Sequence, residues 1–175
     1  NMLGAAAGIA ACGKIPFVAT FAAFFTRAYD FIRMAAISQS NIKLVGTHVG
    51  VSIGEDGPSQ MGLEDLAMMS TQPGVTVLYP SDGLSMYKLM ESATAHKGMV
   101  YLRAGRPKTP VIYGADETFK IGGSKVLRQS AADQLTIVAA GVTLFEALKA
   151  HDQLKAAGIV TRVGDIARLT NDIAH

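Results

Sequence analysis

Short apolar runs alternate with longer helical segments through the first hundred residues, and this alternation constrains the fold most. The strand-like runs lie at 16–21, 41–47, 74–80 and 99–104. The segments between them carry apolar residues at helical spacing and lie at 24–38, 61–71 and 82–96, the last with Ser81 or Asp82 as its N-cap. Such β-α-β-α-β order is typical of an α/β fold with a parallel sheet flanked by helices.

A second, shorter α/β unit is predicted after a change in composition. Residues 107–123 are rich in proline, glycine and short polar runs, and we interpret them as a linker between a first domain at 1–106 and a second at 124–175. Beyond the linker, 134–141, 143–158 and 159–166 form one further β-α-β unit. A free-standing doubly wound domain needs more strands, so the second domain is expected to be truncated.

Composition excludes some classes of partner. Hydrophobic residues make up 49% of the chain and charged residues 17%, which indicates surface buried against another domain or subunit. The net charge of +2 is spread along the sequence, so we expect no nucleic-acid partner. There is no apolar run near the ~20 residues of a membrane span, and the single Cys12 cannot form an internal disulfide. We therefore expect no membrane partner and a cytoplasmic location.

The stretch "THVGVSIGEDGPSQ", residues 47–60, concentrates polar chemistry where a predicted strand ends. Ligands of open α/β sheets bind at such carboxyl ends. One interpretation is an elaborate turn, in which Glu55 and Asp56 are solvated or bond the backbone. The other is a rigid loop in which His48, Asp56 and Gln60 hold hydroxyl groups of a polar substrate. The loop lacks both the dinucleotide fingerprint and the phosphate-gripping P-loop pattern.

Two aromatic and two basic residues near other strand ends also have two interpretations each. Phe21 and Phe24 are either core aromatics or an apolar slot for a flat heterocycle. Arg103 and Arg106 are either surface charges or a grip for a phosphate or carboxylate. No metal-ligand spacing connects the histidines outside the loop.

Taken together, these motifs resemble a known family. "ATFAAFFTRAYDFIRMAAIS", "GTHVGVSIGEDGPSQ", "LEDLAMM", "YPSDG" and "LRAGRP" follow one another as in the pyrimidine-binding domain of transketolase. The resemblance covers residues 1–106 with high specificity. It continues more loosely to about Asp165 as the start of the family's C-terminal domain, and residues 166–175 diverge from it.

The resemblance implies a thiamine diphosphate enzyme of the pentose phosphate pathway that moves a two-carbon ketol unit from a ketose phosphate to an aldose phosphate. Phe21 and Phe24 would hold the cofactor's aminopyrimidine ring, with Gln60 near cofactor or substrate. His48 would be catalytic and, with Asp56, would contact substrate hydroxyls, and Arg106 would bind the substrate phosphate. The cofactor's diphosphate and its Mg or Ca ion would be bound by a separate domain, commonly from the second subunit of a homodimer.

Two family motifs are incomplete in these 175 residues. Only Asn1 and Met2 match the end of "AEQNM", which contains the family's cofactor-activating glutamate, and the diphosphate domain's GDG motif is absent. We therefore expect a fragment that is inactive alone. The alternatives are a catalytically silent interaction or regulatory remnant, or another thiamine diphosphate enzyme: dihydroxyacetone synthase, deoxyxylulose-phosphate synthase or a 2-oxoacid dehydrogenase beta subunit. The sequence motif around His48 favours transketolase among these enzymes.

Overall fold

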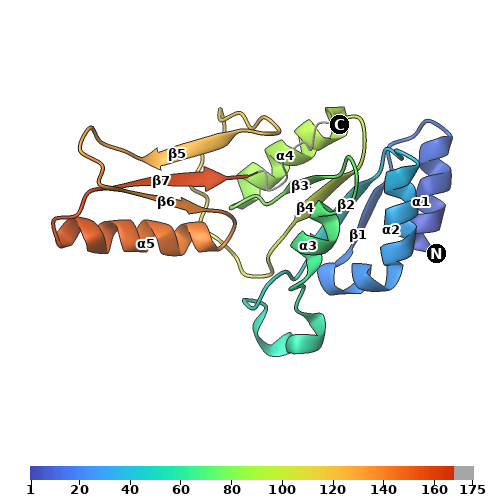
Figure 1. Ribbon diagram of the computed structural model, residues 1–175, viewed down its shortest axis with the longest axis horizontal. Helices are drawn as coiled ribbons and strands as arrows, with labels where there is room; N and C mark the ends of the chain where they lie inside the picture. Colours follow the sequence, from blue (N-terminus) through green and yellow to red (C-terminus); the bar gives the residue numbers. More distant parts are fainter. Residues whose placement is uncertain (168–175) are drawn as a thin grey trace.

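The computed structural model describes residues 1–167, so most of the divergent stretch 166–175, from residue 168 onward, lies outside the described residues. Two sheets lie side by side along the longest axis of the molecule (Figure 1). The larger sheet is entirely parallel, with strand order β1-β2-β4-β3. Its strands are β1 (Phe17–Phe21), β2 (Lys43–Thr47), β3 (Thr76–Leu78) and β4 (Val100–Arg103). The parallel sheet predicted from the sequence is confirmed.

Helices cover both faces of this sheet. They are α1 (Met2–Ala11), α2 (Tyr29–Ile37), α3 (Asp65–Ser70) and α4 (Gly83–Ala95). One core cluster joins α1, α2 and α3 to the sheet, and a second joins α4 to the opposite face. Within β4, Tyr101 belongs to the first cluster, while Val100 and Leu102 belong to the second. This follows from the two-residue period of a strand, and it explains why Val100, Tyr101 and Leu102 are all apolar or aromatic.

Two helix boundaries differ from the sequence prediction. The predicted helix at 24–38 is divided into a 3-10 helix, η1 (Ala22–Ala28), followed by α2. Both helix types bury a similar apolar stripe, so periodicity alone does not separate them. The helix predicted from residue 61 begins only at Asp65. By contrast, Asp82, one of the two predicted candidates, is the N-cap of α4. Its carboxylate accepts from the Ser85 amide at 2.7 Å in a capping box.

The smaller unit contains the predicted β-α-β and one strand that the sequence analysis missed. Strands β6 (Leu135–Ala139) and β7 (Thr161–Ile166) pair in parallel, with α5 (Thr143–Ala156) packed on both. The additional strand, β5 (Ser124–Arg128), pairs antiparallel with the other side of β7. The sheet order is therefore β5-β7-β6.

Buried polar contacts join the two units. The Asp165 carboxylate in β7 accepts from the Ser81 hydroxyl at 2.9 Å and from the Tyr113 hydroxyl at 2.5 Å. Tyr113 lies in the predicted linker 107–123, which contains no helix or strand but packs Tyr113 and Phe119 into the core beneath α4. Burial raises the pKa of Asp165 above its usual range. Because these carboxylate and hydroxyl groups are buried and bonded, they fix the relative position of the units.

Apolar side chains remain exposed on the outer helices. Those on α1 and α2 are Met2, Ile9, Phe31, Met34 and Ile37. The two helices pack against each other, and this exposed apolar surface agrees with the high apolar content of the sequence. Within residues 1–167, no helix has the length and apolar character required to cross a membrane.

Candidate functional site

The carboxyl ends of three neighbouring strands bring the predicted site residues together. In the parallel register Phe21 at the end of β1 is opposite Thr47 at the end of β2, and Gly46 is opposite Arg103 at the end of β4. His48 follows β2 directly, and Arg106 lies three residues beyond β4. The sheet therefore positions both side chains at the carboxyl ends of its strands, where α/β folds bind ligands.

His48 adopts a backbone conformation that is rare for its residue type. Its φ is +57°, in the left-handed region. The imidazole stacks on Phe21 with ring centroids 3.6 Å apart, and Nδ1 shares a hydrogen bond of 3.0 Å with the Thr47 hydroxyl. Nε2 lies on the other side of the ring, 3.8 Å from an Asp56 carboxylate oxygen. The backbone turn thus presents Nε2 toward the glycine-rich loop.

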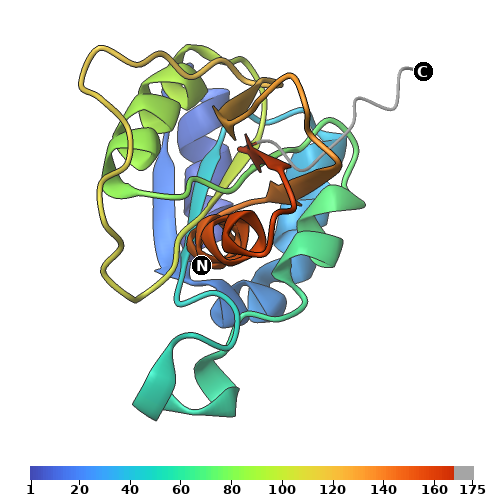
Figure 2. The ribbon, with the colours of Figure 1, turned by 90° about the vertical axis from the view of Figure 1, so that its left-hand side faces the viewer.

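The loop from His48 to Gly62 projects from the body of the molecule (Figures 1 and 2). Backbone hydrogen bonds close its base, where the Gly50 amide donates to the Gly62 carbonyl and the Gly62 amide donates to the His48 carbonyl. At Gly62 an added Cβ would lie 2.6 Å from the Ala22 Cβ, so only glycine fits there. At the tip, the 3-10 turn η2 (Gly54–Asp56) begins at Gly54 and is followed by Gly57, both with φ of +76°.

Arg106 ties this loop tip to the end of β4. Its Nη1 donates to the Ile53 carbonyl at 2.5 Å and lies 3.4 Å from Asp56, while Nη2 lies 2.8 Å from Glu55. The hydrogen bond between Arg106 and Glu55 lowers the pKa of the Glu55 carboxyl and raises the pKa of the guanidinium. Three residues predicted for the site, His48, Asp56 and Arg106, are thus brought together in the structure.

Phe21 and Phe24 form a stack that continues from His48. Their centroids are 5.3 Å apart with 4° between the planes, and 46% of Phe24 is exposed. Because the exposed ring is flat and apolar, it offers a surface that a heterocycle can cover. Phe24 is therefore not a buried core aromatic, and the role of the pair as a slot for a heterocycle stays a prediction.

Arg103, which the sequence left open as a phosphate grip, is a structural residue. Its guanidinium is buried and forms two hydrogen bonds to Asp65, at 2.7 and 3.1 Å. It also lies over the Tyr79 ring and donates to the Gly62 carbonyl at 3.4 Å. Arg103 therefore supports the base of the loop, and the structure contradicts both interpretations left open for it, a surface charge and a grip for a ligand.

Among the residues near the site, the role of one stays a prediction and two others were missed by the sequence analysis. Gln60 ends the 3-10 turn η3 (Pro58–Gln60), and its side-chain oxygen accepts from Ser59 at 2.5 Å, so a cofactor or substrate role stays a prediction. Thr47, which bonds the His48 ring, and Asp65, which bonds Arg103, were missed. Thr47 directly precedes His48 and could have been noticed. Nothing local to Asp65 indicates a partner distant in sequence.

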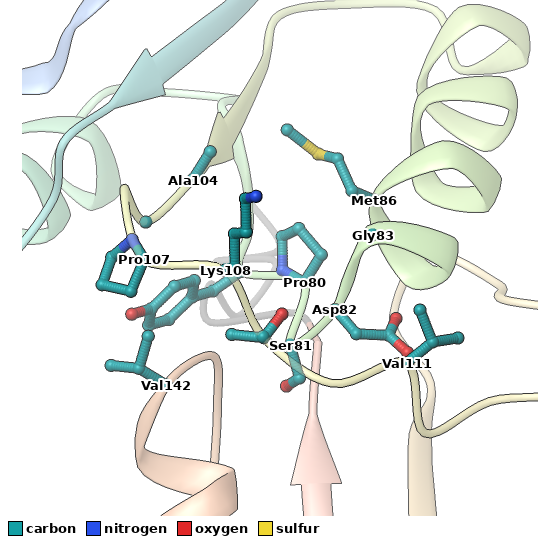
Figure 3. A pocket seen from close by; sticks show the side chains of 13 residues that line it. Pro80, Ser81, Asp82, Gly83, Met86, Ala104, Pro107, Lys108, Val111 and Val142 are labelled. Atoms are coloured by element: carbon teal, nitrogen blue, oxygen red, sulfur yellow. The ribbon is translucent and has the colours of Figure 1, made fainter.

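A separate cavity of about 400 Å³ lies where the two units meet (Figure 3). It is bordered by the Tyr79–Gly83 turn before α4, by Met86 of α4, by Val142, and by residues on either side of Arg106. The site residues predicted from the sequence are not among those lining it. Among residues 1–167, no cluster of three or more His, Cys, Asp or Glu side chains is arranged to hold a metal ion.

Comparison with known proteins identifies the family of this chain. The family model for the transketolase pyrimidine-binding domain matches residues 1–111, and the model for the transketolase C-terminal domain matches residues 124–170. The chain belongs to the transketolase family. Transketolase-like protein 2 of Mus musculus is 57% identical over 95% of the chain, and transketolase of Homo sapiens is 54% identical over 94%.

These relatives are considerably longer than the 175-residue chain. The chain spans 27% of the length of each of these two transketolase relatives. A solved structure described as "Split gene transketolase, inactive beta4 tetramer" superposes with a TM-score of 0.88 at 38% identity, covering 97% of this chain and 54% of that one. The transketolase fold therefore extends through both the large and the small unit of this chain.

Proposed function

We propose that these residues form the pyrimidine-binding side of a transketolase active site, which transfers a two-carbon ketol unit from a ketose phosphate to an aldose phosphate. The observation that supports this most is the convergence of His48, Asp56 and Arg106 beside the Phe21–Phe24 stack. When bound, thiamine diphosphate supplies the nucleophilic carbon that carries the transferred unit. Phe21 and Phe24 would hold its aminopyrimidine ring, and Gln60 would contact cofactor or substrate.

The polar residues recognise the sugar phosphate. His48 Nε2 and the Asp56 carboxylate are 3.8 Å apart, too far for a direct hydrogen bond, so a substrate hydroxyl beside them can bond to both. His48 also exchanges a proton with that hydroxyl during the transfer, since an imidazole nitrogen can either donate or accept a proton. Arg106 binds the phosphate through its planar fork of donors. Asp56 and the Ile53 carbonyl orient that fork.

The complete site requires groups supplied by other residues. We propose that a separate diphosphate-binding domain, in the same polypeptide or in a second subunit, binds the diphosphate and its Mg or Ca ion. The exposed apolar side chains of α1 and α2 support such a partner surface. A homodimer acting in the cytoplasmic pentose phosphate pathway is consistent with this proposal. The split-gene relative, whose title describes an inactive beta4 tetramer, also supports the expectation that these 175 residues alone are inactive.

A chimera tests this proposal directly. Residues 1–167 replace the matching stretch of human transketolase, and turnover of xylulose 5-phosphate with ribose 5-phosphate is measured with thiamine diphosphate and magnesium. We expect ketol transfer by the chimera and none by the isolated chain. The His48→Ala chimera should lose about a hundredfold in turnover while its thermal unfolding changes little. A folded but inactive chimera would contradict the proposal and favour a catalytically silent interaction module.

A further inference from the structure

Arg106, the proposed phosphate-binding residue, is already occupied by acceptors from its own chain. Nη1 donates to the Ile53 carbonyl and faces Asp56, whereas Nη2 lies 2.8 Å from a Glu55 oxygen. A phosphate binds arginine through parallel N–H donors, and Nη2 belongs to that fork. A phosphate that uses Nη2 must therefore compete with the Glu55 carboxylate.

The two acidic neighbours of Arg106 differ in how firmly they are held. The Asp56 side chain is 31% exposed and lies between the guanidinium and His48. The Glu55 side chain is 81% exposed and reaches the guanidinium from the solvent side. Exposed ion pairs contribute little to stability because water competes for both charges. Glu55 can therefore leave Arg106 at small cost, while Asp56 stays with its two partners.

The loop backbone places Glu55 at this position. Gly54 and Gly57, both with positive φ, bound the tight turn that contains Glu55 and Asp56. An added Cβ at Gly54 would lie 3.9 Å from Arg106 Nη1, so the turn passes directly beside the guanidinium. This geometry places a carboxylate where the incoming anion is to bind.

We infer that Glu55 is an internal competitor for the phosphate group at Arg106. Its carboxylate occupies Nη2 in the free chain and swings into solvent when a phosphorylated sugar binds, so Glu55 weakens phosphate binding and thereby sets its affinity. The inference rests on the proposed function, because it assumes that Arg106 receives the phosphate. A phosphate dianion displaces the single carboxylate because it offers more charge and more acceptor oxygens.

Titration of the 175-residue chain with inorganic phosphate tests this inference. Amide signals of residues 53–57 and 106 are followed by nitrogen-15 NMR in the wild type and in Glu55→Gln. We expect Glu55→Gln to bind phosphate about twofold to fivefold more tightly, the range that one exposed ion pair spans. The difference should shrink at a salt concentration of about 1 M, where exposed charges are screened. Ribose, which lacks a phosphate, should show no difference between the two chains.

A matched control separates the local effect from the change in net charge. Glu146 also forms an exposed ion pair, with Lys149, and lies in the smaller unit on α5. Glu146→Gln makes the same change in net charge as Glu55→Gln, and we expect it to bind phosphate as the wild type does. If Glu55→Gln binds no more tightly than Glu146→Gln, the inference is wrong.

A third variant distinguishes this failure from failure of the proposed function. Arg106→Gln should lose the phosphate response of residues 53–57. If it does, but Glu55→Gln shows no gain, Arg106 binds phosphate and only the competitor role of Glu55 fails. If Arg106→Gln responds as the wild type does, or if no chain responds to phosphate, the assignment of phosphate to Arg106 fails along with the inference.

Discussion

The imidazole of His48 stacks on the ring of Phe21, with centroids 3.6 Å apart and 14° between the planes. Stacking holds one face of the imidazole, the Thr47 hydroxyl bonds Nδ1, and a left-handed backbone aims Nε2 at Asp56. Each contact restrains a different freedom of the side chain. The register of the sheet brings Phe21 close to His48, because Phe21 and Thr47 are partners at the ends of β1 and β2.

The left-handed backbone at His48 predicts a distinct ranking of substitutions. Asparagine tolerates positive φ, whereas a β-branched residue is strained there. We expect His48→Val to reduce the free energy of unfolding by about 1–2 kcal/mol more than His48→Asn does. Urea unfolding of both variants measures this difference. Equal stabilities would show that residue 48 leaves the left-handed region in solution.

The buried pair of Arg103 and Asp65 predicts a large loss of stability. Arg103→Met leaves the Asp65 carboxylate buried without its cation, which costs about 3–5 kcal/mol. Because Arg103 also bonds the Gly62 carbonyl, the Gly50 amide that shares this acceptor should exchange with deuterium faster. Urea unfolding and amide exchange measure the two effects.

An exposed pair serves as the control for Arg103. The side chains of Lys149 and Glu146 are 68% and 72% exposed and lie one turn apart on α5. We expect Lys149→Met to change stability by at most about 0.5 kcal/mol. A comparable loss in both variants would mean that burial does not determine the contribution of the Arg103 pair.

The sequence alone predicted all four strands of the larger sheet but only two of the three strands of the smaller one. Strands β1, β2, β3 and β4 are apolar and lie between helical segments, so local pattern is sufficient to find them. Strand β5 was missed because only Val126 and Leu127 are apolar within "SKVLR". Its pairing comes from the distant strand β7, and no local periodicity reports a partner so far along the chain.

The candidate site shows the same division between local and distant information. His48 and Asp56 stand out because a glycine-rich loop follows a strand, which a sequence displays directly. Arg103 and Arg106 look equivalent in "LRAGRP", yet Arg103 is buried against Asp65 and Arg106 faces the loop. Which arginine is available depends on the sheet face and on a partner 38 residues away, and both are properties of the tertiary structure.

Gly46 predicts a packing defect that the exposed Gly8 does not share. A Cβ at Gly46, inside β2, would lie 2.2 Å from the Tyr101 hydroxyl oxygen, which is buried and bonded to Asp65. We expect Gly46→Ala to destabilise the chain by about 3 kcal/mol, because the ring has no room to move. Gly8 is exposed in α1 with nothing within 4 Å, so Gly8→Ala should stabilise by about 0.5–1 kcal/mol. Thermal unfolding should therefore shift in opposite directions for the two variants.

Tyr113 makes the junction between the two units sensitive to alkaline pH. Burial, and then the hydrogen bond to Asp165, raise the pKa of Tyr113 above its usual value of about 10. Above about pH 10 the unfolded chain releases this proton while the folded chain retains it, so Tyr113 alone contributes a fall in stability of about 1.4 kcal/mol per pH unit as pH rises. Tyr113→Phe should lower stability at neutral pH but flatten this slope. Tyr87→Phe, at a side chain that folding leaves exposed, should not change it. Urea unfolding across the alkaline range decides the matter, and an unchanged slope in Tyr113→Phe would contradict the prediction.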